Sequence, residues 1–137
     1  MSYDLSRFIE AQERDYATAL DEIKAEYKRS HWIWYIFPQI AGLGYSPMAV
    51  KYEIADLQEA KAYMANDYLR NHLIEITRAL LACKNNDIGE IMGYPDDLKL
   101  RSCMTLFEIA APDVPEFGHV IERFFGGKRD EMTLERV

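Results

Sequence analysis

Apolar residues recur three and four positions apart along most of this chain, which is the spacing of a helix that buries one face. The first such pattern begins after Asp4, a suitable N-cap, and leaves Arg7, Glu10 and Arg14 on the opposite side. It predicts a long amphipathic helix, or two helices if Asp15 starts a second one. The stripe expected to be buried consists of Leu5, Phe8, Ile9, Gln12, Tyr16, Ala19, Leu20, Ile23 and Tyr27.

Start and stop signals divide the rest of the chain into further helices. Ser46-Pro47 offers a capping residue followed by proline at the first helical position, and Asp56, Asp67 and Asp130 precede other helical patterns. Glycine and proline then end several of these segments. The signals predict helices over residues 48–54, 57–66, 67–83, 97–110, 117–125 and 131–137, with a single turn near residues 88–95.

One segment, SHWIWYIFPQ at residues 30–39, has no clear periodicity. Its central residues, 32–37, are apolar throughout, so the pattern fits a buried strand or a buried helical turn, and local propensity favours the strand. One isolated strand would have no sheet to join. The whole chain, residues 1–137, is therefore expected to form one all-α domain, a compact globule of seven or eight helices.

Composition narrows the possible functions. The chain has 137 residues, the size of one domain, and its net charge of −7 repels nucleic acid polymers and anionic membrane surfaces. No apolar run approaches the length of a membrane span or forms a signal core, which predicts a cytoplasmic protein. Cys83 and Cys103 fall within helical patterns and are expected to be reduced core thiols.

Lys99 is the first residue that the helical pattern does not explain. At 100° per residue it lies near the centre of the apolar arc of the helix that starts at Asp97, and Ser102 lies on the same side one turn later. A buried ammonium group is costly unless it meets a carboxylate, several acceptors or an anionic ligand. Two interpretations remain open: the lysine stem covers apolar surface while its amine reaches water, or the amine points into a ligand site.

Gln12 is the second exception, because it occupies the middle of the first buried stripe. Its amide can clamp the backbone of a neighbouring loop or line a ligand site. His31 opens the aromatic run and is the only candidate catalytic acid or base, although it also suits an ordinary helix-terminal histidine. The other candidate ligand-binding residues are Trp32, Trp34 and Gln39, since tryptophan beside cations is a common platform for planar rings, while the simpler alternative is that these aromatic rings are core.

Several chemistries have no support in the sequence. The three histidines and two cysteines are scattered and form no close metal-ligand pair, so no metal site is expected. The glycines at 42 and 44 lack the spacing of a dinucleotide or P-loop motif, and no other motif indicates a cofactor. A nucleophile elbow is absent, and Asp96 and Asp97 suit a helix start.

Four segments, SHWIWYIFPQ, GLGYS, PDDLKLRSCMTLFEIAAPD and FFGGKRDEMTL, together with Ala11-Gln12 and EAKAY at 59–63, resemble an uncharacterised family known as domain of unknown function 1810. The resemblance covers essentially the whole chain and implies a compact multihelical domain, which favours a helix for the aromatic run. Some members carry the name calpastatin, an unstructured protease inhibitor that a chain with 49% hydrophobic residues does not resemble. The family usually has two serines where this chain has Ser102-Cys103, and it implies no catalytic residues.

The leading hypothesis is a protein that binds a small anionic ligand, such as a nucleotide or an ADP-ribose-like molecule, and hydrolyses or transfers it if it is an enzyme. Lys99 would neutralise the anion, Gln12 and Ser102 would donate hydrogen bonds, and a tryptophan would stack on a ring. The alternative from another class is a protein-interaction module that exposes the aromatic and glycine-rich segment 30–46 to a partner.

Overall fold

A computed structural model describes residues 3–137 and confirms the all-α fold. Within this part of the chain there are nine helices and no strand apart from one isolated parallel bridge between Ile40 and Ile54. The helices are Ser6–Lys24 (α1), Ile33–Ile36 (α2), Pro47–Tyr52 (α3), Leu57–Ala65 (α4), Asp67–Ala82 (α5), Ile88–Met92 (α6), Asp96–Ala110 (α7), Glu116–Phe125 (α8) and Glu131–Arg136 (α9).

The ninth helix, beyond the seven or eight expected, is α2, which lies in the aromatic run. The strand favoured by local propensity is wrong for this segment, because it forms a single helical turn. Five side chains of residues 32–37 reach the core because a helical turn points them in several directions, whereas a strand would need a partner along its length. The backbone becomes extended only after Pro38, where Ile54 N donates to the Gln39 carbonyl at 2.9 Å.

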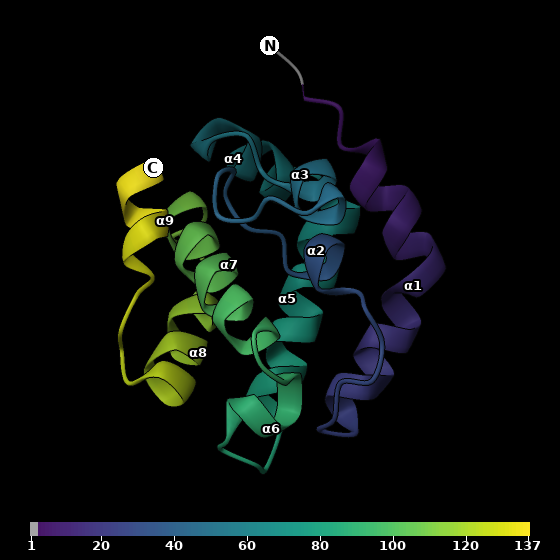
Figure 1. Ribbon diagram of the computed structural model, residues 1–137, viewed down its shortest axis with the longest axis vertical. Coiled ribbons are helices and arrows are strands. Elements are labelled where there is room, and N and C mark those ends of the chain that lie inside the picture. Colours follow the sequence, from purple (N-terminus) through teal and green to yellow (C-terminus); the bar gives the residue numbers. More distant parts are fainter. Residues whose placement is uncertain (1–2) are drawn as a thin grey trace.

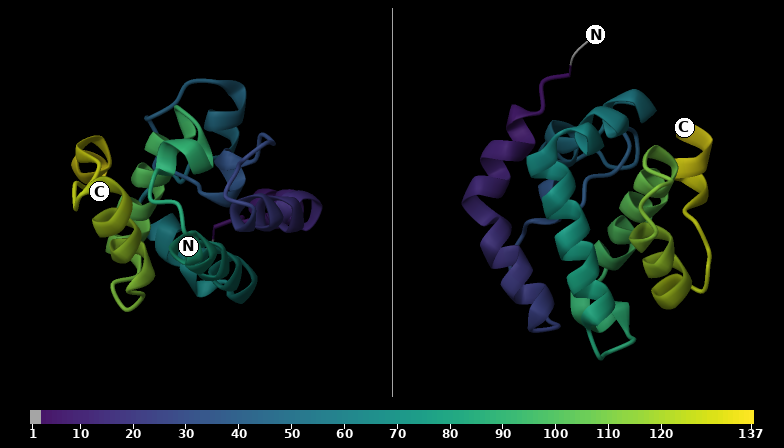
Figure 2. Two further views of the ribbon diagram at one scale, coloured as in Figure 1. Left: turned by 90° about the horizontal axis from the view of Figure 1, so that it is seen from below. Right: turned by 180° about the vertical axis from the view of Figure 1, so that it is seen from behind.

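The long helices form a row with α5 in the middle. Helix α1 packs along one side of α5 and α8 along the other, as the view from behind in Figure 2 shows. Helix α7 packs on α8 and α4, and α9 covers α7 near the C-terminus (Figure 1). Helices α2 and α3 and the loop between them lie on the front, between α1 and α7 (Figure 1).

Side-chain caps fix the two helices that border this front. The Ser46 hydroxyl accepts from Ala49 N at 3.2 Å and starts α3, as the sequence predicts, and the Asp130 carboxylate accepts from Thr133 N at 3.1 Å and starts α9. Helix α5 is capped by Asn66 instead of the predicted Asp67, which is its first helical residue. Asp130 also accepts from Ser102 Oγ of α7 at 3.1 Å, which holds the start of α9 on α7.

One apolar core joins α1 to α8, and the predicted core thiols belong to it: Cys83 and Cys103 are both free and buried. Most of the aromatic run is buried as well, with Trp32, Ile33, Tyr35, Ile36 and Phe37 each at most 4% exposed. None of the helices in residues 3–137 is long and apolar enough to cross a membrane.

Candidate functional site

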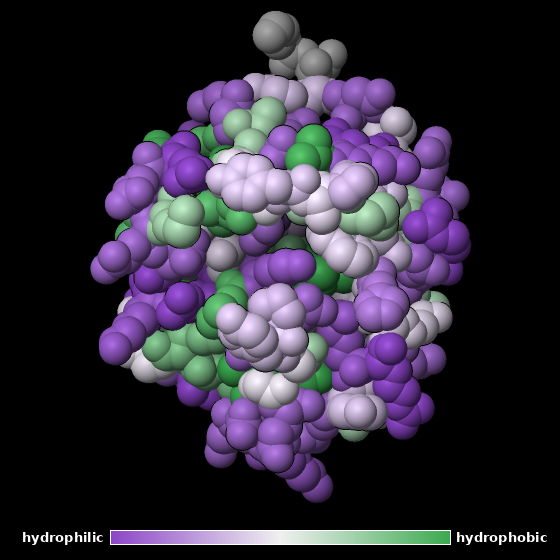
Figure 3. Space-filling view, in the orientation of Figure 1, coloured by the Kyte–Doolittle hydropathy of each residue, from purple (hydrophilic) through white to green (hydrophobic). Residues whose placement is uncertain are grey.

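The front of the molecule is hollowed where α7 faces the loop before α3. Figure 3 shows this hollow near the centre of the face, with hydrophobic atoms visible in its depth. Its outer part, the outer groove, encloses about 440 Å³. The outer groove is lined by Gln39, residues 43–46 and Ala49, by Pro95, Leu98, Lys99, Arg101 and Ser102 of the α7 side, and by Asp130 and Met132 of the α9 side.

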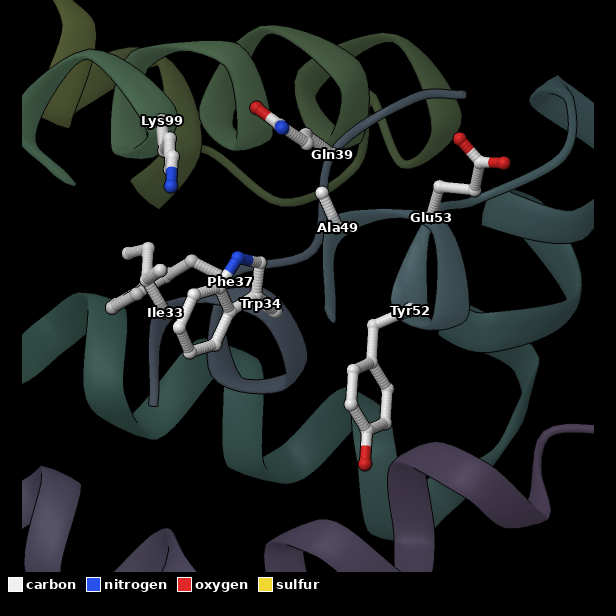
Figure 4. A pocket seen from close by; sticks show the side chains of 8 residues that line it. All are labelled: Ile33, Trp34, Phe37, Gln39, Ala49, Tyr52, Glu53 and Lys99. Atoms are coloured by element: carbon white, nitrogen blue, oxygen red, sulfur yellow. The ribbon is translucent and has the colours of Figure 1, made fainter. Parts of the chain in front are cut away.

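A smaller space, the inner chamber, adjoins the groove and shares Gln39, Ala49 and Lys99 with it. Its volume is only about 10 Å³, room for roughly one water-sized atom. Figure 4 shows its lining from close by. The inner chamber is lined by Ile33, Trp34, Phe37, Gln39, Ala49, Tyr52, Glu53 and Lys99.

Helix geometry explains why α7 presents two cations to the same groove. Successive residues of an α-helix are about 100° apart, so Leu98 and Ser102 point in nearly the same direction and form the floor. Lys99 and Arg101 then lie about 80° to either side of that direction. Long side chains at such angles can fold over the floor from both flanks, and both residues line the groove.

Lys99 has no carboxylate of its own. Its Nζ lies 3.8 Å from Asp96 Oδ1, but Asp96 Oδ2 is only 2.7 Å from the Nζ of Lys28, whose side chain is 5% exposed. Lys28 therefore holds the stronger pair with Asp96. The Lys99 ammonium lies 5.4 Å from the centroid of the Trp34 ring, and the Glu53 carboxylate of the inner chamber points away from it (Figure 4).

Two buried N–H donors near this hollow have no acceptor within residues 3–137. They are Nε1 of Trp34, in the inner chamber, and Nε of Arg101, on the flank of the outer groove. A buried donor without a partner costs about 1–3 kcal/mol, so few native groups remain in that state. The two orphaned donors and the Lys99 ammonium make the hollow rich in donors that the protein itself does not use.

The acceptors on the far side of the groove are already engaged. Asp130 Oδ2 accepts from Ser102 Oγ at 3.1 Å and from the hydroxyl and backbone N–H of Thr133. Its other oxygen lies 4.0 Å from the Arg101 guanidinium, a loose pair. Asp130 thus holds α9 against α7, and it leaves the Arg101 guanidinium only partly neutralised.

Four of the seven predicted site residues come together in this hollow. Trp34, Gln39 and Lys99 line the inner chamber, and Gln39, Lys99 and Ser102 line the outer groove. The Ser102 hydroxyl is 3.1 Å from Asp130 and 3.2 Å from the Leu98 carbonyl, so its single proton already has acceptors.

The other three residues lie elsewhere. Gln12 is 2% exposed and belongs to a clamp between α1, α2, α4 and α5, in which its Nε2 donates to the Tyr35 carbonyl and the Tyr63 hydroxyl at 2.9 and 3.0 Å. Its Oε1 accepts from His72 Nδ1 at 2.9 Å. This is the backbone-clamping alternative for Gln12, and the amide lines neither the inner chamber nor the outer groove.

Trp32 and His31 are also separate from the hollow. Trp32 is 1% exposed and its Nε1 donates to Glu22 Oε1 at 2.9 Å. The ring is therefore part of the core, and its N–H is not available to a ligand. His31 is exposed and lines neither part of the hollow. The single site that would combine all seven residues is therefore not formed.

Sequence reasoning missed two contributors. Arg101 falls on the polar face of its helix at 100° per residue, yet it flanks the groove. The signal that could have found it is its position two residues after Lys99, on the other side of the direction in which Leu98 and Ser102 point. Tyr45, which is 86% exposed, stands at the groove rim. Its position depends on the path of the loop, which no periodicity encodes.

The rim of the groove is apolar, whereas its flanks carry the charged side chains of Lys99 and Arg101. Tyr45 and Met132, the latter 50% exposed, stand at the rim, and Leu98, 40% exposed, adds apolar surface on the floor. Within residues 3–137 no group of three or more His, Cys, Asp or Glu side chains is placed to hold a metal ion. The arrangement is suited to holding an organic molecule that has an apolar body and an acceptor-rich, negatively charged group.

Fold and site together define a small all-α protein with a donor-rich hollow walled by aromatic and aliphatic side chains. The chain belongs to the family described as "Protein of unknown function (DUF1810)", whose model matches residues 2–137. It is similar to the conserved hypothetical protein Rv1873 from Mycobacterium tuberculosis, known from a crystal structure at 1.38 Å, with 43% sequence identity and a TM-score of 0.95. That match covers 97% of this chain and 95% of the other. No curated protein matches the chain.

Proposed function

We propose that this protein binds a small organic anion in the outer groove and that it does so in the cytoplasm. Nucleotides and ADP-ribose-like molecules are the first ligands to test, because they combine a planar ring with negative charge. Lys99 and Arg101 approach the anion from the two flanks of α7, and the apolar rim contacts the rest of the molecule.

The observation that carries this proposal is the incomplete neutralisation of the two cations. Lys99 shares Asp96 with the more tightly bound Lys28, and Arg101 meets Asp130 only at 4.0 Å while its Nε has no acceptor among the described residues. In a chain of net charge −7, carboxylates are abundant. Two cations that nevertheless lack close carboxylates and face one hollow support an external anion as their partner.

The geometry supports binding more strongly than catalysis. His31, the candidate acid or base, lies outside the hollow, and the Asp130 carboxylate is engaged by Ser102 and Thr133. General acid–base chemistry needs a titratable group within hydrogen-bond reach of the reacting atoms. We therefore propose a binding protein, and we assign no hydrolysis or transfer step to its residues.

The interaction-module alternative has less support. Of the aromatic residues in segment 30–46, Trp32, Tyr35 and Phe37 are buried, and Tyr45 is the one whose ring is largely exposed. A single ring offers little area to a protein partner, since binding hot spots depend on clustered anchors.

A thermal-shift screen tests the proposal. The purified protein is heated with nucleotides, ADP-ribose, NAD, sugar phosphates and small carboxylates, each in excess, and the screen is repeated with Lys99→Met. A ligand at 100 times its dissociation constant adds about 2.7 kcal/mol to the free energy of unfolding, which raises the melting temperature by several degrees. We expect one anion class to raise it in the wild type and not in Lys99→Met. The absence of any shift across the panel would contradict the proposal.

A further inference from the structure

We infer that the inner chamber is a subsite for one oxygen of a carboxylate, so that the ligand is an organic carboxylate whose body lies in the outer groove. This inference rests on the proposed function and assigns its substrate class. It follows from what the chamber offers: donors, apolar walls and very little room.

The polar groups at the chamber are mainly donors. Trp34 Nε1 is buried without an acceptor among residues 3–137, and the Lys99 ammonium lies 5.4 Å from the centroid of the same indole ring. Figure 4 shows the indole nitrogen, the lysine ammonium and the Gln39 amide gathered on one side of the chamber. The Glu53 carboxylate and the Tyr52 hydroxyl point away from that side (Figure 4). The Trp34 and Lys99 donors on that side favour an acceptor atom there, and negative charge on it is favourable, while the Gln39 amide can also donate to it.

The remaining walls are apolar. Ile33, Phe37 and Ala49 close the chamber around these donors. An anion in apolar surroundings is stable only if charged or N–H groups replace its lost water, and Lys99 together with Trp34 supplies both kinds of group. Water also fits a space of this size, but a ligand oxygen gains the full ion-pair contribution of Lys99 when it displaces that water.

The volume distinguishes between anions. About 10 Å³ accommodates one oxygen atom, and a flat carboxylate can insert one oxygen while the other remains at the mouth beside Lys99. A phosphate monoester carries three terminal oxygens around a tetrahedral centre, so placing one of them in this space leaves two more charged oxygens to be accommodated at the mouth, whereas a carboxylate leaves one. A phosphate would instead remain in the outer groove, whose volume is about 440 Å³.

Indole N–H resonances provide a direct test, because the chain has only two tryptophans. In uniformly ¹⁵N-labelled protein the Trp32 signal is an internal control, since its Nε1 already donates to Glu22 at 2.9 Å. Trp34→Phe assigns the two signals. The protein is titrated with three molecules that share a phenyl ring: sodium benzoate, phenyl phosphate and neutral benzamide.

We expect benzoate to move the Trp34 indole signal in a saturable way and to leave the Trp32 signal in place. Benzamide should bind at least about tenfold more weakly, because it lacks the charge that Lys99 recognises. Lys99→Met should weaken benzoate binding by about tenfold or more, whereas Lys61→Met, the same change at an exposed lysine of α4 that lines neither space, should not.

The outcomes separate the two proposals. If phenyl phosphate moves the backbone amides of residues 43–46 and 98–102 in a Lys99-dependent way, while no molecule moves the Trp34 indole signal, the groove binds anions and the carboxylate subsite is wrong. An equal response of that signal to phenyl phosphate or benzamide also overturns the subsite. If neither benzoate nor phenyl phosphate moves any signal around the hollow, both the subsite and the proposed function fail.

Discussion

At the scale of single residues, the most informative feature of the sequence was a polar side chain in an apolar stripe. Gln12 stands where a leucine would be ordinary, and the sequence could show that its amide needs partners. It could not name those partners, because Tyr35, Tyr63 and His72 come from three other elements. The same reasoning singled out Lys99, whose amine does reach a ligand-sized hollow. A polar residue in an apolar stripe is therefore a buried structural clamp in Gln12 and a groove residue in Lys99, and only the packing of the helices distinguishes the two cases.

Replacing Gln12 by leucine should destabilise the fold without affecting the groove. The change removes the N–H partner of the Tyr35 carbonyl and the hydrogen bond to the fully buried Tyr63 hydroxyl. We expect the free energy of unfolding to fall by about 2–4 kcal/mol, measured by urea denaturation. Gln58→Leu, the same change at an exposed position of α4, should stay within about 0.5 kcal/mol. Similar losses in the two variants would show that the clamp contributes nothing particular.

Glu22 is a residue whose role the sequence did not reveal. Its carboxylate accepts from the backbone N–H groups of Arg29 and Ser30, from the Ser30 hydroxyl and from Trp32 Nε1, at 2.6–3.0 Å. Burial acts to raise the pKa of Glu22, but these hydrogen bonds outweigh it and lower the pKa to about 2 from an ordinary value of 4.5. The carboxylate thereby ties the start of the aromatic run to α1.

The lowered pKa predicts a specific loss of stability in acid. Because the folded state holds Glu22 ionised, its contribution is complete above about pH 4.5 and is lost as the pH falls towards 2. Glu22→Gln should be about 1–2 kcal/mol less stable than wild type at pH 7, and the difference should shrink between pH 4.5 and 2.5. Thermal melts across this range measure it, with the exposed Glu13→Gln as control. A difference that does not change with pH would contradict this role.

At the scale of elements, α7 is central because it joins the core and the hollow. Its start is held by Lys28, which pairs with Asp96 at 2.7 Å and whose backbone N–H donates to the Ile91 carbonyl at 2.8 Å. Its side towards α9 is held by Ser102 and Thr105, through Asp130. Lys99 takes no essential part in either attachment, which leaves it available for a ligand.

The two lysines beside Asp96 should therefore respond differently to the same substitution. Lys28→Met removes the close, buried partner and leaves Asp96 with a lysine at 3.8 Å, so we expect a loss of about 1–3 kcal/mol. Lys99→Met breaks only the longer contact of a 29% exposed side chain and should cost no more than about 0.5–1 kcal/mol. Urea denaturation of both variants checks this order. The reverse order would mean that Lys99 is chiefly structural.

The elements themselves were largely predictable, and the exceptions have physical reasons. Strong periodicity located α1, α5, α7 and α8, and glycine after Phe125 ended α8, with Gly126 at a φ of 60°. Periodicity left the aromatic run open between a strand and a helical turn, because a run that is apolar on every side has no period to read. Its single helical turn packs on the neighbouring helices α1 and α3 and on α7, which is distant in the sequence.

At the scale of the whole molecule, the candidate site is formed by segments that are separate in the sequence and meet in space. The loop before α3, one side of α7 and the start of α9 meet around one hollow, with α9 joined to α7 by the hydrogen bonds of Asp130 to Ser102 and Thr105, and none of these segments carries a site motif. Residues of the site that contradicted their local pattern, such as Lys99, could be found from the sequence. Residues that agreed with their pattern, such as Arg101 on a polar face and Tyr45 in a loop, could not.

The central claim is that the hollow beside α7 holds an anion through Lys99. Its most direct test is a calorimetric titration, in which the anion giving the largest thermal shift is added to the wild type, to Lys99→Met and to Lys61→Met. We predict one binding site in the wild type and in Lys61→Met, and a dissociation constant at least about tenfold higher in folded Lys99→Met. Equal affinity in all three proteins would place any bound anion elsewhere and contradict the claim.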